Sequence, residues 1–148
     1  MRICASKNMG SNMNSLINNV FEITDSETYE CIIWGYYAGH SQMYVRVYKP
    51  PFETGETFYL GFYTVIYFEG PTRWKGANFR LGTLDDRVNL LQRIRWFEDF
   101  PKEYLDGFHL FVVENPKFKV QILARDADKM TDSPTFSISF PAEESSTG

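Results

Sequence analysis

Between Glu56 and Glu69 the sequence alternates in a way that suits an extended strand. Successive side chains of a strand point to opposite faces of the sheet. One face would carry Phe58, Leu60, Phe62, Thr64, Ile66 and Phe68. The other would carry Tyr59, Gly61, Tyr63, Val65 and Tyr67. Because both faces are apolar or amphipathic, this strand is predicted to lie in the middle of a sheet, with Gly61 at a bulge or a close approach.

Shorter runs of strand-like sequence surround the long strand. They cover residues 30–37, 42–49, 77–81, 108–114, 117–124 and 135–140. A Gly-bearing turn joins the first two runs, and the turn dipeptide Asn115-Pro116 separates 108–114 from 117–124. Hairpin-like spacing without intervening crossover helices predicts antiparallel pairing.

One amphipathic helix is well marked, near residues 83–99. Thr83 is a good N-cap, and Asp86 three residues later makes a variant of the capping box. The apolar stripe that follows consists of Leu84, Val88, Leu91 and Ile94, widened by Leu90 and Phe97. A helix of this kind buries its stripe on a sheet.

The predicted fold class is therefore α+β. We expect a mainly antiparallel, strongly twisted sheet of about six strands, with one main helix packed on one face. The alternative is a small curved barrel with the helix plugging one end. The length of 148 residues predicts a single domain over 1–148.

The two ends of the chain differ from its centre. Residues 1–29 are polar and rich in Asn, and they are predicted to be weakly structured or to form a short helix. That helix would use Met13, Leu16, Ile17, Val20 and Phe21, which have helical spacing. Residues 141–148 are predicted to be a flexible tail.

Composition and charge narrow the classes of function. Aromatic residues make up 17% of the chain, which favours strands. The net charge of −4 makes nucleic-acid binding less expected, because such proteins usually carry a basic footprint. No apolar run reaches the length of a signal peptide or a membrane span, so we expect a cytoplasmic protein without a membrane partner. The two cysteines, Cys4 and Cys31, are expected to be small apolar residues.

The first candidate binding site is a basic and aromatic loop over residues 73–80, with Arg73, Trp74, Lys75 and Arg80. From residue 73 to residue 95 there are six basic residues and two acidic ones. Such a loop can clamp a phosphate, stack on a ring or meet an acidic partner. The alternative is a solvated loop whose Trp74 packs back on the sheet.

The second candidate site is a tyrosine-rich sheet face that includes Tyr59, Tyr63 and Tyr67. Tyrosine is enriched at protein interfaces, but cross-strand aromatic pairs also stabilise sheets. An exposed ladder would therefore favour a binding surface, whereas a covered one would favour packing.

Sequence motifs for catalysis, metals and cofactors are missing. The two histidines, His40 and His109, have no second pair of closely spaced ligands for zinc. There is no G-x-S-x-G elbow and no P-loop. We therefore predict no catalytic residue, metal or cofactor.

The favoured function is a non-catalytic protein-interaction or self-associating module, with itself or another protein as partner. One alternative is binding of a small ligand or a nucleic acid through the loop 73–80. A second alternative is an enzyme with a dispersed active site.

Overall fold

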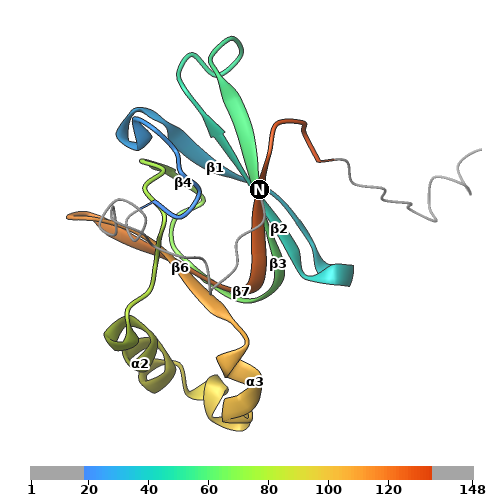
Figure 1. Cartoon of the computed structure of the whole chain (residues 1–148), viewed down its shortest axis with the longest axis vertical. Coiled ribbons are helices and arrows are strands. Elements are labelled where there is room, and N and C mark those ends of the chain that lie inside the picture. Colours follow the sequence, from blue (N-terminus) through green and yellow to red (C-terminus); the bar gives the residue numbers. More distant parts are fainter. Residues whose placement is uncertain (1–18, 135–148) are drawn as a thin grey trace, which may run out of the picture.

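The structure, a computed structural model, describes residues 19–134. Over these residues the chain forms an antiparallel sheet of seven strands that curls into a half-barrel, with helices at one end (Figure 1). The prediction of an α+β fold with a strongly curved sheet is confirmed, although the sheet has seven strands where about six were expected. The strand predicted over 135–140 and the tail 141–148 lie outside the described residues.

The strands follow the order β4-β1-β2-β3-β7-β6-β5 across the sheet. Their bounds are Glu30–Tyr37 for β1, Gln42–Tyr48 for β2, Thr57–Glu69 for β3, Arg73–Lys75 for β4, Arg80–Leu81 for β5, His109–Asn115 for β6 and Phe118–Met130 for β7. Short 3-10 turns lie at Ser26–Thr28 (η1) and Ala38–His40 (η2). The two outermost strands have only three and two residues, which limits pairing with other chains at the sheet edges.

Strand β3 lies in the middle of the sheet, between β2 and β7, as predicted. Its predicted faces are right except at Val65 and Ile66. Thr64 has a φ of 54°, and the pairing with β7 shifts register between Val65 and Tyr67. As a result Val65 joins the inner core and Ile66 packs on the outer side, while Phe68 returns to the inner side.

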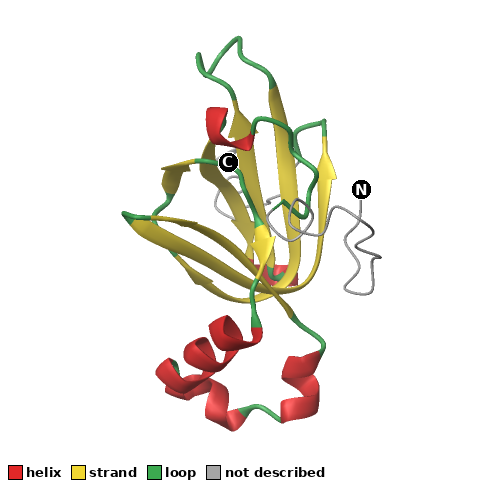
Figure 2. Ribbon diagram, turned by 60° about the vertical axis from the view of Figure 1, so that its left-hand side comes forward, coloured by secondary structure: helices red, strands yellow, loops and turns green. Residues whose placement is uncertain are grey.

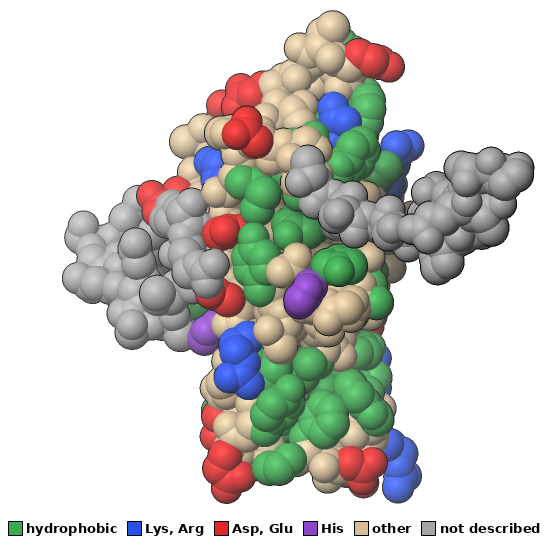
Figure 3. All heavy atoms as spheres, turned by 90° about the vertical axis from the view of Figure 1, so that its right-hand side faces the viewer, with side chains coloured by type: hydrophobic (Ala, Val, Ile, Leu, Met, Phe, Trp, Pro, Cys, Tyr) green, Lys and Arg blue, Asp and Glu red, His purple; other side chains and the backbone are tan. Residues whose placement is uncertain are grey.

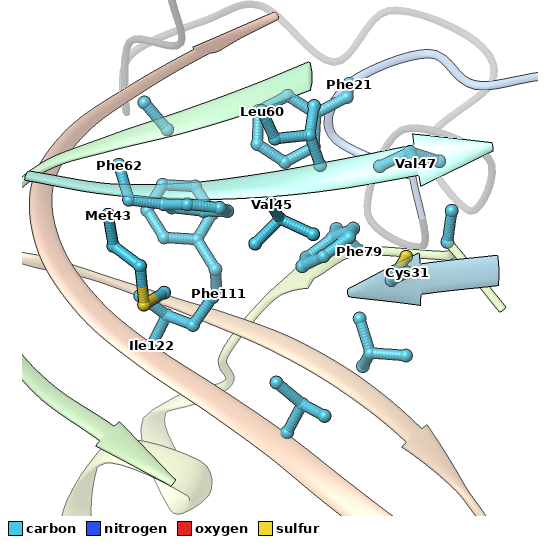
Figure 4. Packing of buried hydrophobic residues seen from close by; sticks show 14 of the residues in the cluster. Phe21, Cys31, Met43, Val45, Val47, Leu60, Phe62, Phe79, Phe111 and Ile122 are labelled. Carbon is cyan, nitrogen blue, oxygen red and sulfur yellow. The ribbon is translucent and has the colours of Figure 1, made fainter. Parts of the chain in front are cut away.

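Four phenylalanines fill the inside of the half-barrel (Figure 4). Phe21, Phe62, Phe79 and Phe111 are all fully buried. The rings of Phe62 on β3 and Phe111 on β6 lie 5.3 Å apart between centroids, although β7 separates these strands in the sheet. Most ring pairs in the cluster meet edge to face or tilted, the geometries that aromatic quadrupoles favour.

The segment before β1 supplies part of this inner core. Phe21 and Ile23 are buried, and the Val20 N–H donates to the Phe79 carbonyl at 2.8 Å. Residues 19–21 are not helical in the structure, and the rest of the helix predicted from Met13 onwards lies outside the described residues.

A helical unit, residues 84–106, is inserted between β5 and β6, which pair with each other. It contains α2 (Leu84–Arg93), the 3-10 turn η3 (Arg95–Asp99) and α3 (Lys102–Asp106). Figure 2 shows these helices gathered at one end of the sheet. The capping box at Thr83 and Asp86 is confirmed. The helix predicted to reach residue 99 ends at Arg93, because Ile94 adopts an extended conformation.

The helical unit packs on the outer side of the sheet through a second apolar cluster. Its buried members are Leu90, Phe97, Leu105, Phe108, Leu110, Val112 and Leu123. The helix therefore covers a sheet face and does not plug a barrel.

A polar network fixes the start of α2 to the sheet. Asp86 accepts hydrogen bonds from Arg80 Nη1 at 2.7 Å, from the Thr83 N–H at 2.8 Å and from Lys119 Nζ at 3.0 Å. Arg80 also donates to Glu114 at 2.9 Å. Burial alone would raise the pKa of Asp86, but these hydrogen bonds outweigh it and hold that pKa well below its ordinary value.

Asp86→Asn is expected to destabilise the fold at neutral pH by about 1–3 kcal/mol, because the charged acceptor of the hydrogen bonds from Arg80, Thr83 and Lys119 is lost. A carboxyl whose pKa is lower in the folded chain contributes stability above its unfolded pKa, and this contribution disappears as the pH falls. The variant should therefore lose less stability than the wild type on acidification below about pH 4. Urea unfolding across this range measures both effects, with the exposed neighbour change Asp85→Asn as control. Equal acid slopes in wild type and D86N would contradict the prediction.

Candidate functional site

An apolar groove runs along the helical unit, between α2 and the η3–α3 segment. Its volume is about 610 Å3. It is lined by Leu84, Arg87, Val88, Leu91, Gln92, Phe97, Glu98, Phe100, Lys102, Leu105 and Asp106. Figure 3 shows hydrophobic side chains gathered on the surface at the helical end of the molecule, with charged side chains at the margin.

One wall of the groove is the apolar stripe of α2. Leu84 and Val88 are 76% and 40% exposed, and Leu91 continues their row at helical spacing. The prediction that this stripe packs on the sheet is therefore wrong for its first two residues. Leu90 is the buried residue of this helix on the sheet side, where it shares a cluster with Phe97 from the segment after α2.

An aromatic row follows the η3–α3 segment, and Phe100 is its member in the groove lining. Trp96, Phe100, Tyr104 and Phe108 follow one another with ring centroids 4.6, 5.6 and 5.1 Å apart. Trp96 is 51% exposed and Tyr104 is 41% exposed. Trp96 and Tyr104 therefore add exposed aromatic surface to the helical unit outside the groove lining.

Arg87 joins the two walls of the groove. Its guanidinium donates to the Phe108 carbonyl at 2.8 Å and to the Leu105 carbonyl at 3.0 Å. These bonds tie the middle of α2 to the end of α3. Arg87 is therefore a positioning residue that sets the spacing of the walls.

The four residues of the predicted basic and aromatic loop do not form one cluster. Arg73, Trp74 and Lys75 make up strand β4, where a loop was predicted. Trp74 is buried in the inner core, and its Nε1 donates to the Gly76 carbonyl at 3.0 Å. Arg73 and Lys75 are exposed on the other face of β4, whereas Arg80 is bound to Asp86 and Glu114.

The three predicted tyrosines separate into two environments. Tyr59 is buried, and Tyr63 donates its hydroxyl to Asp128 at 2.7 Å. Both lie on the outer face of the sheet away from the helical unit. Tyr67 instead packs on Phe97, at 5.7 Å between ring centroids, beneath the helical unit. These tyrosines therefore do not form a continuous exposed ladder.

Arg46 is the centre of a group that the sequence did not single out. Its guanidinium carbon lies 3.8 Å from the Phe52 ring centroid and 4.9 Å from that of Trp34. Its Nη2 also donates to the Phe52 carbonyl at 3.2 Å. These contacts hold the loop after β2 against the outer face. The alternation over residues 42–49 is the signal that places Arg46 on the same face as Tyr44 and Tyr48.

Cross-strand pairing brings Arg73 to this same face. Arg73 pairs with Ile32, Ile32 with Arg46, and Arg46 with Tyr59. With Trp34 still 37% exposed, the outer face therefore carries basic and aromatic side chains together.

Other reactive side chains lie apart from the groove lining. Burial lowers the pKa of His109, with a further contribution from Arg87. Burial raises the pKa of the Cys31 thiol, and Cys4 lies outside the described residues. Among residues 19–134, no group of three or more His, Cys, Asp and Glu side chains is placed to hold a metal ion. In the same part of the chain, no helix has the length and apolar character needed to cross a membrane.

Comparison with protein-family models found no match to this chain, and neither did comparison with curated proteins or with solved structures. The geometry of the helical unit and of the outer sheet face is therefore the basis for inferring a function.

Arg87→Met is expected to lower the free energy of unfolding by about 2–4 kcal/mol, because two charge-assisted hydrogen bonds are lost. The Leu105 carbonyl keeps the Phe108 N–H as a donor, whereas the Phe108 carbonyl loses its bond to Arg87. Denaturant unfolding measures this loss. Arg95→Met is the matched control, since the Arg95 side chain is 87% exposed and its ion pair with Glu98 is long, at 3.8 Å. The control should change stability by less than about 0.5 kcal/mol. An equal effect of the two substitutions would show that Arg87 does not join the walls.

Proposed function

We propose that this chain is a non-catalytic protein-interaction module, and that its helical unit binds an apolar segment of a partner in the groove between α2 and α3. The observation that supports this proposal is the exposed stripe of Leu84 and Val88. Exposing large apolar side chains side by side is unfavourable in water, so such a surface is typical of an interaction site.

The composition of the groove agrees with a protein partner. Aromatic residues are enriched at the centres of interfaces, and Phe97, Phe100 and the neighbouring Trp96 and Tyr104 supply them here. The side chains of α2 and the η3–α3 segment form two walls rather than a closed cavity. This shape suits an extended or helical segment better than a small molecule, which is usually enclosed.

The double substitution Leu84→Asp with Val88→Asp is expected to abolish peptide binding while leaving the fold intact. Peptides selected from a displayed random library on the wild-type chain should carry large apolar residues at helical spacing. Their affinity should fall by at least about tenfold on the double variant, because each buried apolar side chain contributes about 1.5–3 kcal/mol.

Asn89→Asp is the matched control, since Asn89 is an exposed residue of the same helix outside the groove lining. It should retain full affinity for the selected peptides. Circular dichroism and thermal unfolding establish that each variant is folded. Peptides that bind wild type and double variant equally, or a selection that yields no binding peptide, would disprove the proposal.

A second candidate, binding of an anionic ligand such as a single-stranded nucleic acid, is favoured by the row of Arg73, Arg46 and Tyr59 beside Trp34. Stacking on an exposed indole together with basic side chains is a common mode of binding single strands. The net charge of −4 works against it.

This second candidate predicts that a thymidine oligonucleotide quenches the tryptophan fluorescence, and that Arg73→Ala with Lys75→Ala weakens its affinity by about tenfold. Lys102→Ala, at an exposed position of the helical unit, serves as the control and should leave the affinity for the oligonucleotide unchanged. A titration in which wild type and double variant bind equally weakly would eliminate this candidate.

A further inference from the structure

The proposed function leaves open which kind of segment occupies the groove, and the shape of α2 bears on this. Leu84, Val88 and Leu91 are spaced i, i+4 and i+7, so they form a straight row about 10 Å long on one side of the helix. A row of this kind is matched by a second helix with the same spacing of apolar residues. An amphipathic helix is therefore the conformation that fits the exposed stripe.

The charges of the helical unit are unbalanced. Its exposed acidic residues are Asp85, Glu98, Asp99, Glu103 and Asp106, and its exposed basic residues are Arg93, Arg95 and Lys102. Arg93 binds Glu69 at 2.6 Å, and Arg95 contacts Glu98 at 3.8 Å. Among residues 19–134, four acidic residues and one basic residue of the unit therefore have no ion-pair partner, namely Asp85, Asp99, Glu103, Asp106 and Lys102.

The two remaining charged residues of α2, Asp86 and Arg87, are both engaged in other contacts. Arg87 lines the groove but directs its guanidinium at the carbonyls of Leu105 and Phe108. Asp86 is bound to Arg80 and Lys119. The groove lining is itself balanced, with Glu98 and Asp106 against Arg87 and Lys102. The negative excess that a partner meets belongs to the helical unit as a whole and is carried by Asp85, Asp99 and Glu103 outside the lining.

This excess discriminates between possible occupants. A second copy of the chain would bring the same acidic residues together, and like charges across an interface are costly. A nucleic acid or an acidic peptide would be repelled for the same reason. A segment with lysine or arginine beside its apolar row would be attracted and oriented.

We propose that the groove of the helical unit binds an amphipathic helix of another protein, and that the polar side of this helix is basic. This inference rests on the proposed function. The apolar row of that helix packs on Leu84, Val88 and Leu91. Its basic residues are attracted by Asp106 in the groove lining and by the other exposed acidic residues of the unit, Asp85, Asp99 and Glu103.

Two synthetic peptides of about 18 residues test this assignment, a length at which helices form in water. Both carry leucine at i, i+4 and i+7, and they differ only in having lysine or glutamate on the polar side. Fluorescence anisotropy with the full chain should give at least ~10-fold tighter binding of the lysine peptide, weakened by added salt. A lysine peptide with the leucines scrambled should bind at least ~10-fold more weakly.

Charge reversal supplies the matched variants. Asp99→Lys with Asp106→Lys should abolish or invert the preference for the lysine peptide. Glu27→Lys with Glu53→Lys makes the same change in net charge at exposed sites outside the helical unit, and the preference should remain. The Leu84→Asp and Val88→Asp variant should bind neither peptide.

The outcomes separate the two proposals. If both leucine peptides bind equally, or the glutamate peptide binds more tightly, and L84D/V88D removes binding, the groove is a protein-binding site but the basic partner is disproved. If neither peptide binds the wild-type chain, this inference and the proposed function both fail. A dimer in light scattering that L84D/V88D converts to monomer would identify a second copy as the occupant and overturn the basic helix.

Discussion

Contact between Phe62 and Phe111 is what the rest of the molecule depends on. These rings come from strands that are not neighbours, so their contact requires the sheet to curl. Phe21 and Phe79 complete the cluster and bring two irregular segments into the inside of the half-barrel. Because the inner side is closed in this way, only the outer side of the sheet is left to carry the helical unit and the Trp34–Arg46 group.

Much of the fold follows from local rules that act within the sequence. Alternation places β3 in the middle of the sheet, and the capping box at Thr83 starts α2 where expected. The alternation does not predict that Val65 and Ile66 exchange sheet faces. This exchange depends on the left-handed conformation of Thr64 and on a register shift against β7, a strand far along the chain. The end of α2 at Arg93 does not follow from local rules either, because Ile94 adopts an extended conformation and Phe97 after it is buried in the outer cluster.

The candidate site is harder to predict from sequence than the fold. Periodicity marks Leu84 and Val88 as apolar but does not say whether another element covers them. Trp74 reads as a loop residue because Gly70-Pro71 and Gly76 flank it, yet a three-residue pairing with β1 turns it into the core. The group around Arg46 forms because Phe52, in the loop after β2, packs on the Arg46 guanidinium. A contact of this kind leaves no periodic signal in the sequence.

The helical unit leaves the sheet at β5 and returns at β6, two strands that are hydrogen-bonded to each other. Its ends are therefore held together by the sheet, and opening the unit does not require the half-barrel to come apart. An opened unit would gain the conformational entropy of its residues, less the cost of keeping the ends of the loop together, and that cost grows only slowly with loop length. The unit thus has the connectivity of a separate cooperative segment, able to lose its own order while the phenylalanine core stays intact.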